Sequence, residues 1–458
     1  MRQHHLAFAL IAAAVLTACG GNGSSGGDQA PKIRFSAQVA FGDSLSDVGS
    51  YAVGTVKTLG GGKFGINGDF TSVNPALTGK NWTELMATQL GLAAPCAAET
   101  GLDGNAANGF AVPIVFHAGC TNYAQGGARV INPVGVKHKL TGSAFGALTV
   151  PISAQIQNHL NVSGGKFSGT ELVLMMAGAN DVFMQLAGLA ADATAAGTAA
   201  GTSTFGSTLV GLLSAGATNP QTAAPAIGVA LQTEAARPGH TDASVVAAAV
   251  GAAAVQPGNS AVAAPAVYGP MVASAQAAAA SAGANAGAAY FAATGPSLVS
   301  AMATVANELT ALVKNQVIAK GANYVVVNNM PNIGATPFGR GFDGAKLALV
   351  NAMVKAFNDA LGAGLASEPK VVYVDAFASS QDQAANPSQY GLTNVSTAAC
   401  DLSPAKNPLD SALACNGSNL IAGDVSHYLY ADTVHPTPFG YLLLARTVSK
   451  GLAQKGWL

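Results

Sequence analysis

The chain has 458 residues, of which 9% are charged and 50% are hydrophobic, and its 21 Lys+Arg against 22 Asp+Glu give a formal net charge of −1. Proteins that bind nucleic acid by neutralising phosphates need a basic excess, and disordered chains need low hydrophobicity with high net charge, so both classes are excluded. The length allows one large domain or two to three ordinary ones and is ample for a sizeable core.

The N-terminus is predicted to be a targeting segment. An apolar run at residues 6–16 is too short to cross a bilayer but fits the hydrophobic part of a secretory signal. It ends in LTACG at residues 16–20, which resembles a bacterial lipobox. Residues 1–18 are therefore predicted to be a lipoprotein signal peptide, with Cys19 lipidated; an ordinary signal peptide with an incidental cysteine is the alternative. The Gly/Ser-rich residues 19–35 are predicted to be a flexible tether.

Cysteine usage agrees with export. Beside Cys19 the chain has four cysteines, and the pairings Cys96–Cys120 and Cys400–Cys415 would close short loops. Two other connectivities are possible, and a zinc site is a weaker alternative because no close Cys/His cluster is present. We expect a protein that is lipid-anchored to the bacterial outer membrane or cell surface, with a periplasmic or secreted location as alternatives. The lipid is then its sole attachment to the membrane, and the sequence leaves its oligomeric state open.

The first predicted strand covers residues 37–41 and leads into a Gly-Asp-Ser turn that carries Ser44. A serine there lies at the carboxyl edge of a sheet, where α/β proteins build their sites, and Gly42 allows the tight turn. Such turns are common, so Ser44 becomes a candidate nucleophile only if a base is found. Residues 81–90 space their apolar side chains at helical intervals and predict a helix.

Two further turns could supply hydrogen-bond donors. Residues 122–128 (NYAQGGA) form a glycine turn that presents backbone N–H groups. Residues 172–176 (LVLMM) predict a buried strand, and GAND at residues 178–181 follows it, which places the amide of Asn180 at the same sheet edge as Ser44. Backbone donors combined with an Asn amide are what an oxyanion hole requires.

The middle of the chain interrupts this alternation. Residues 187–297 are predicted to be an Ala-rich, mainly helical insertion, and residues 243–307 contain no charged side chain. Prolines are expected to interrupt its helices, so that no uninterrupted apolar helix could span a membrane. We interpret the insertion as a structural spacer, which is favoured for such a composition, with a lid or an apolar docking surface as the alternative.

Helix and strand patterns resume after the insertion. A helical pattern over residues 298–320 stops at a glycine, and another covers residues 345–365, while residues 324–327 and 371–374 are β-branched apolar runs. Continuous apolar strands separated by helices indicate a parallel sheet covered on both faces. The predicted fold is a three-layer α/β/α sandwich with a central, mostly parallel sheet, covering residues 36–458 around the insertion.

A candidate base lies near the C-terminus, in DTVHPT at residues 432–437. The spacing allows the Asp432 carboxylate to reach one imidazole nitrogen of His435 while the other faces a nucleophile. Thr437 and Pro438 then fit the start of a last helix, which would fix the His-bearing loop. Asp424 and His427 have the same spacing but lack the proline and the helix start, so we interpret that pair as an ordinary loop.

The four motifs in this order resemble the GDSL branch of the SGNH hydrolases, of the secreted bacterial esterase/lipase type. The resemblance covers about residues 38–186 and 298–458. It implies the triad Ser44, Asp432 and His435 and an oxyanion hole of Ser44, Gly127 and Asn180. Gly127 follows from counting five residues on from Asn122. The resemblance implies no metal and no cofactor.

The implied activity is hydrolysis of carboxylic esters, on a small-molecule or lipid ester. The apolar insertion and the predicted anchor favour fatty-acyl esters. A carbohydrate acetylesterase is the alternative within enzymes, although the chain has only two tryptophans for stacking on sugars. A catalytically silent, surface-binding lipoprotein is the alternative from another class.

Overall fold

A computed structural model describes residues 33–68 and 78–458. The predicted signal peptide, Cys19 and most of the predicted tether lie outside these residues. Among the helices in the described part of the chain, none combines the length and the hydropathy that crossing a bilayer needs.

The central sheet has four parallel strands in the order β1 (Gln38–Gly42), β4 (Leu172–Met176), β5 (Tyr324–Asn328) and β6 (Val371–Val374). Its register aligns Ala40 with Leu174, Leu174 with Val326, and Val326 with Val372. All four strands coincide with predicted apolar runs. The strand prediction is confirmed. A strand covered on both faces is apolar along its centre, and the polar Gln38 and Asn328 stand at strand ends.

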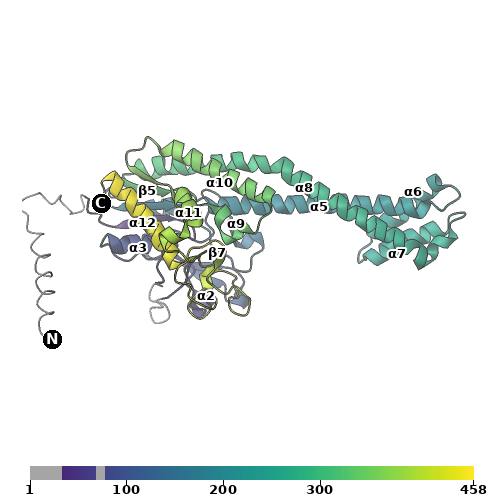
Figure 1. Cartoon of the computed structure of the whole chain (residues 1–458), viewed down its shortest axis with the longest axis horizontal. Coiled ribbons are helices and arrows are strands. Elements are labelled where there is room, and N and C mark those ends of the chain that lie inside the picture. The colour runs from purple at the N-terminus through teal and green to yellow at the C-terminus, as the bar shows by residue number, and fades with distance from the viewer. Residues whose placement is uncertain (1–32, 69–77) are drawn as a thin grey trace, which may run out of the picture.

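Helices cover both faces of this sheet, so the predicted three-layer α/β/α fold is confirmed (Figure 1). Alternate strand residues point to opposite faces. Leu172, Leu174 and Val326 pack under α3 (Trp82–Gln89) and α12 (Pro438–Lys455). Val173, Met175 and Val325 pack under α4 (Ile152–Val162), α10 (Gly344–Leu365) and the last turns of α8 (Pro265–Leu312).

Shorter elements surround the carboxyl edge of the sheet. The helices are α2 (Gly54–Thr58), α9 (Pro337–Arg340) and α11 (Ala376–Ala385). The strand pairs are antiparallel β2 (Glu99–Asp103) with β3 (Ala111–Phe116), and parallel β7 (Asn394–Ala398) with β8 (Tyr428–Tyr430). Disulfides join Cys96 to Cys120 and Cys400 to Cys415, which confirms the predicted pairings.

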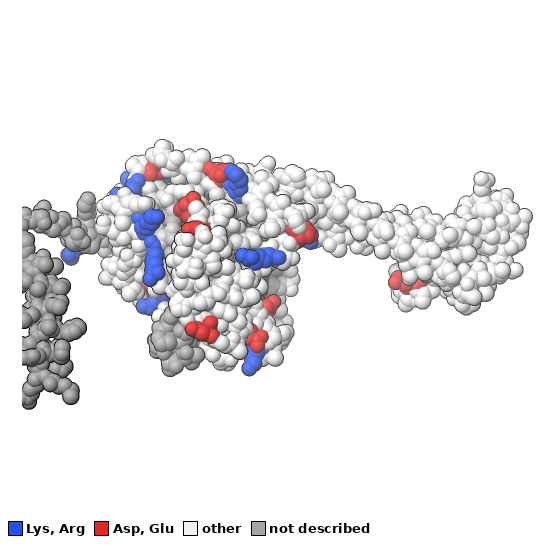
Figure 2. All heavy atoms as spheres, viewed as in Figure 1, with Lys and Arg blue, Asp and Glu red and all other residues white. Residues whose placement is uncertain are grey.

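A long helical arm projects from the body (Figure 1). It consists of α5 (Ala179–Ser214) and the antiparallel α8, with α6 (Pro220–Ala235) and α7 (Asp242–Ala254) at the far end. The far end has a core of its own, built from Leu209, Leu213, Ile227, Ala249 and neighbouring residues. The arm is almost uncharged, as the white surface in Figure 2 shows; residues 193–307 have only Glu234, Arg237 and Asp242 as charged side chains.

Two expectations about this region are corrected. The predicted interruption by proline holds at Pro257 and Pro265, which lie at the break between α7 and α8, but is wrong at Pro270 and Pro296, because α8 is one 48-residue helix that continues through both. Pro270 and Pro296 are both exposed, and the extensive packing of α8 against α5 offsets the cost of the two lost hydrogen bonds. The helix predicted over residues 298–320 is the end of α8 and its π-helical continuation Val313–Ile318, which stops before Gly321 at φ +111°.

Residues 187 and 297, the expected limits of the insertion, both lie inside helices. The arm is therefore an outward extension of two helices whose inner ends belong to the body, with no linker at its base.

Candidate active site

Ser44 lies in the tight turn that follows β1, at the carboxyl edge of the sheet. The turn is closed by hydrogen bonds from the Ser46 amide to the Asp43 carbonyl and from the Leu45 amide to the Asp43 carboxylate. A Cβ atom on Gly42 would lie 2.9 Å from the Met176 carbonyl oxygen of β4, so the position leaves no room for a side chain. The Ser44 hydroxyl lies 2.9 Å from Nε2 of His435.

His435 is held by the loop between β8 and α12. Its Nδ1 lies 2.7 Å from Oδ2 of Asp432, and Oδ1 of Asp432 accepts the amides of Val434 and His435 itself. Thr437 caps α12 by accepting the Gly440 amide, and Pro438 occupies the first helical position, as predicted. The turn after β1 and the loop before α12 therefore meet, and Ser44, His435 and Asp432 are joined in a row at hydrogen-bond distances.

The electrostatics of this arrangement favour an ionised Asp432. Burial alone would raise the pKa of its carboxyl, but the charge of His435 and hydrogen bonds from His435 and the Ala412 amide outweigh burial and lower the pKa to about 2. One face of the His435 imidazole is covered by Phe64, whose ring centroid lies 4.8 Å from that of His435. The imidazole is thus fixed at both nitrogens and on one face.

The second Asp/His pair has different partners. Nδ1 of His427 lies 2.8 Å from the Ser426 hydroxyl, and its ring packs edge-on against Phe439 at 4.6 Å. Asp424 accepts the Ser426 amide. Neither side chain lines the cavity at Ser44.

Three hydrogen-bond donors near the Ser44 hydroxyl have a hydrogen to spare: the amides of Ser44 and Gly127 and the side chain of Asn180. Within the described chain the two amides have no acceptor, whereas the neighbouring Gly126 donates its amide to Asp47. Gly127 has φ +83°, and a Cβ atom there would lie 2.5 Å from the Val136 carbonyl oxygen. Asn180, in the first turn of α5, uses one Nδ2 hydrogen to bond the Ala128 carbonyl at 2.9 Å and keeps the other. The geometry thus separates Gly127 from Gly126.

Two buried carboxylates that the sequence analysis did not identify hold the glycine turn from both sides. Asp47 accepts the Gly126 amide at 3.0 Å, and Asp181 accepts the Val130 amide at 3.1 Å and Nε of Arg129 at 2.8 Å. Burial raises the pKa of both carboxyls. Asp47 lies two residues after GDSL and Asp181 is the last residue of GAND, which was the available signal, but a sequence does not reveal which side chains in or near a motif point inward.

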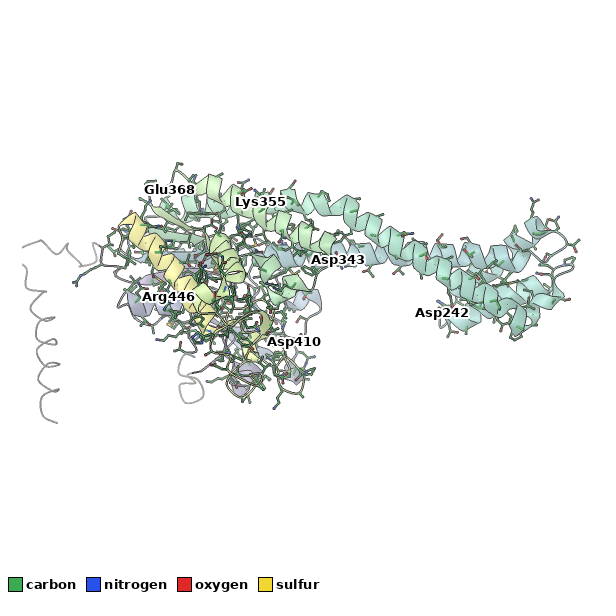
Figure 3. All side chains as sticks on the ribbon, viewed as in Figure 1. Asp242, Asp343, Lys355, Glu368, Asp410 and Arg446 are labelled. Atoms are coloured by element: carbon green, nitrogen blue, oxygen red, sulfur yellow. A yellow bond between two sulfur atoms is a disulfide. The ribbon has the colours of Figure 1, made fainter. Side chains whose placement is uncertain are left out.

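A largely apolar cavity of about 490 Å³ opens at these groups. Its walls include Phe64, Phe145, Phe183 and Phe338, while Lys137 and Asp410 supply charged groups; Asp410 is labelled in Figure 3. Pockets of this size that combine an apolar lining with a few polar groups are typical of small-molecule sites. Among the described residues, no three His, Cys, Asp or Glu side chains converge as a metal site would need.

Fold, motif order and site geometry together define an α/β protein of the GDSL type. The family model of the GDSL-like lipases/acylhydrolases matches residues 192–448, more than half of the chain, and the protein belongs to this family. That span contains Asp432 and His435, while Ser44, Gly127 and Asn180 precede it.

A more specific likeness is to a GDSL esterase/lipase of Arabidopsis thaliana. The two sequences are 29% identical over 141 residues, which is 28% of this chain and 37% of the plant protein. The chain therefore matches little more than a third of the length of this curated relative.

Proposed function

We propose that the protein is a serine carboxylic ester hydrolase. The observation that carries the proposal is the continuous contact from the Asp432 carboxylate through the His435 imidazole to the Ser44 hydroxyl, at 2.7 and 2.9 Å. A hydroxyl that hydrogen-bonds a base, itself oriented by a carboxylate, is an activated nucleophile. Membership of the GDSL-like lipase/acylhydrolase family supports the same conclusion.

In the proposed mechanism His435 takes the Ser44 proton while Ser44 attacks the ester carbonyl, and Asp432 stabilises the imidazolium. The amides of Ser44 and Gly127 and the Asn180 side chain donate to the tetrahedral oxyanion. His435 then protonates the leaving alcohol. A water molecule activated by His435 cleaves the acyl-serine and releases the acid.

An apolar ester is the favoured substrate, because most of the cavity at Ser44 is lined by aromatic and aliphatic side chains. The alternative, a carbohydrate acetylesterase, is disfavoured because both tryptophans of the chain are buried. Trp82 and Trp457 are buried in the cluster that α12 and α3 form on one face of the sheet, so neither is free to stack on a sugar.

The test is hydrolysis of p-nitrophenyl butyrate by Ser44→Ala, with Ser36→Ala as the control at an exposed serine. We expect Ser44→Ala to abolish turnover and covalent labelling by a fluorophosphonate, and Ser36→Ala to retain both. Labelling or turnover that survives in Ser44→Ala would refute the assignment. A wild-type chain that neither hydrolyses esters nor takes the probe would favour the alternative, a surface-binding protein without catalytic activity.

We also propose that the chain is exported and lipid-anchored through Cys19. The LTACG motif and the two disulfides support this location. Labelled palmitate should enter the wild-type protein in a bacterial host and be absent from Cys19→Ser; equal labelling of the two chains would contradict the proposal.

A further inference from the structure

The cavity at Ser44 is the first of three apolar hollows along α5. The second, of about 880 Å³, lies between α5, α8 and the start of α10, and the third, of about 1190 Å³, lies at the far end of the arm. Helix α5 lines all three through residues spaced three or four apart, which places them on one helix face. On this face lie Asn180, Phe183, Ala187, Ala190, Thr194, Gly197, Gly201 and Phe205, and the adjoining Met184, Ala193, Thr202 and Gly206 also line the hollows.

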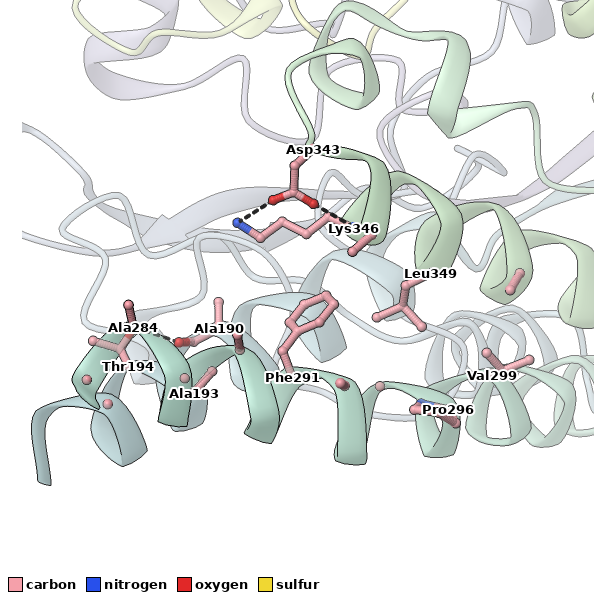
Figure 4. A pocket seen from close by; sticks show the side chains of 18 residues that line it. Ala190, Ala193, Thr194, Ala284, Phe291, Pro296, Val299, Asp343, Lys346 and Leu349 are labelled. Carbon is pink, nitrogen blue, oxygen red and sulfur yellow. Dashed lines mark hydrogen bonds and ion pairs between the residues drawn. The ribbon is translucent and has the colours of Figure 1, made fainter. Parts of the chain in front are cut away.

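The second hollow is shown in Figure 4. Phe291 of α8 and Leu349 of α10 lie across it from each other, and small residues of α5 and α8 form its floor. Its two charged residues, Asp343 and Lys346, are 3.6 Å apart and pair with each other at the rim. An uncharged aliphatic ligand therefore suits this hollow better than an ionic one.

Aromatic side chains separate the first hollow from the second. Phe183 packs edge-on against Phe338 at 5.3 Å, and Phe338 against Phe342 at 4.7 Å. The boundary between these two hollows is therefore formed by apolar rings. The third hollow continues this character with Phe205 and Leu231, and has His240 and Asp242 in its lining.

The length of this series of hollows limits what could occupy it. From Asn180 to Phe205, α5 rises about 38 Å at 1.5 Å per residue. A bilayer core of about 30 Å holds two fatty-acyl chains end to end, so one such chain reaches about 15 Å. A single fatty acid would fill the Ser44 cavity and leave the arm empty.

We propose that the three hollows form one binding track for an aliphatic polyester chain, which presents successive esters to Ser44. The three hollows follow one another along one face of α5 from the candidate active site, are almost uncharged, and together are longer than a single acyl chain. This inference rests on the proposed function and narrows its substrate class to water-insoluble polymeric esters. It gives the arm a role in binding substrate in addition to that of a spacer.

The test uses the full chain and fills the second hollow. Ala288 of α8 lines that hollow and is exposed, so Ala288→Trp adds bulk to the track without entering a core. The matched control is Ala293→Trp, on the opposite side of α8, exposed and outside the lining. For each chain the rate on polycaprolactone particles is divided by the rate on p-nitrophenyl butyrate. We expect this ratio to fall at least 10-fold in Ala288→Trp and less than 2-fold in Ala293→Trp.

Binding without turnover is a second readout. In a Ser44→Ala background the chain should co-sediment with polycaprolactone particles, and Ala288→Trp should weaken this binding at least 10-fold, provided its circular dichroism is unchanged. Equal ratios and equal binding in the two tryptophan variants would overturn the proposal. The proposal would also be overturned if Ala288→Trp abolished binding to neutral phospholipid vesicles while polyester binding persisted. The same conclusion would follow if Ala288→Trp abolished self-association in ultracentrifugation while polyester binding persisted. A wild-type chain inactive on p-nitrophenyl butyrate would instead refute the proposed function.

Discussion

The α/β body, which carries Ser44 and His435, and the helical arm are stabilised by different interactions. In the body, directional hydrogen bonds fix the segments around Ser44: Gln155 bonds both the amide and the carbonyl of Gly42, and Asp47 and Asp181 accept amides of the glycine turn and the residues that follow it. In the arm, small residues bring two backbones together; a Cβ atom on Gly197 would lie 2.8 Å from the Gly283 carbonyl oxygen. Directional bonds can fix donors and acceptors to within a fraction of an ångström, whereas close helix packing provides an extended surface.

The comparison shows how one helix can serve both regions. The first turn of α5 carries Asn180 and Asp181, its next turn lines the Ser44 cavity, and the remainder builds the arm. We therefore expect changes in the body to affect the chemical step and changes in the arm to affect stability and access to polymeric substrate.

The largest expected effect separates the two Asp/His pairs of the body. His435→Ala should lower kcat on p-nitrophenyl butyrate by at least about 10⁴-fold, because it removes the base that contacts Ser44. His427→Ala is the control, and its kcat should stay within about 2-fold of wild type. Similar losses in both variants would show that geometry alone does not identify the base.

A smaller loss of activity is expected at Asn180 of α5, the proposed oxyanion donor. Asn180→Ala should lower kcat about 10²- to 10³-fold, or about 2.7–4 kcal/mol, with little change in KM, because the bond strengthens in the transition state. Asn161→Ala, at an exposed asparagine of α4, is the control. A rise in KM at constant kcat would mean that Asn180 binds the ground state instead.

The next prediction concerns the pH dependence of stability. Burial raises the pKa of Asp43 to about 6, from an ordinary value of 3.8. The folded chain therefore holds this proton more tightly than the unfolded chain, and stability is lost as pH rises between about 4 and 7. In Asp43→Asn, the decrease in the free energy of unfolding over this pH range should be smaller by up to about 3 kcal/mol. Urea unfolding at pH 4.5 and 7.5 measures it, and an identical pH slope in both chains would contradict it.

The smallest predicted effect compares two glycines of α5. At Gly188 a Cβ atom meets nothing within 4 Å, so Gly188→Ala should stabilise the chain by about 1 kcal/mol through helix propensity. At Gly197 the same change forces the α5 and α8 backbones apart and should destabilise it by about 1–2 kcal/mol. Thermal unfolding of both variants tests the difference; two stabilised chains would show that the arm is not closely packed.

Several elements of the body were predictable because local physics decides them. The four central strands are apolar at consecutive positions, and Thr437 with Pro438 marks the start of α12. The continuity of α8 through Pro270 and Pro296 was not predictable, because it depends on the packing of α5 against the helix. The buried contacts of Asp47 and Asp181 were missed for the same reason: the atoms they bond are distant in sequence.

The amino-acid order by itself determined the strands of the sheet and the motif residues, since each depends on side-chain type and spacing along a short segment. It favoured the disulfide pairs Cys96–Cys120 and Cys400–Cys415 but left other connectivities open, and the structure joins these two pairs. The sequence resemblance pointed to Gly127, but only the tertiary structure shows that the neighbouring Gly126 amide is already bonded, because Asp47 accepts it across 79 residues of chain. It also decided that α5 and α8 extend together into an arm, because that outcome depends on two helix faces fitting each other, which neither sequence segment contains alone.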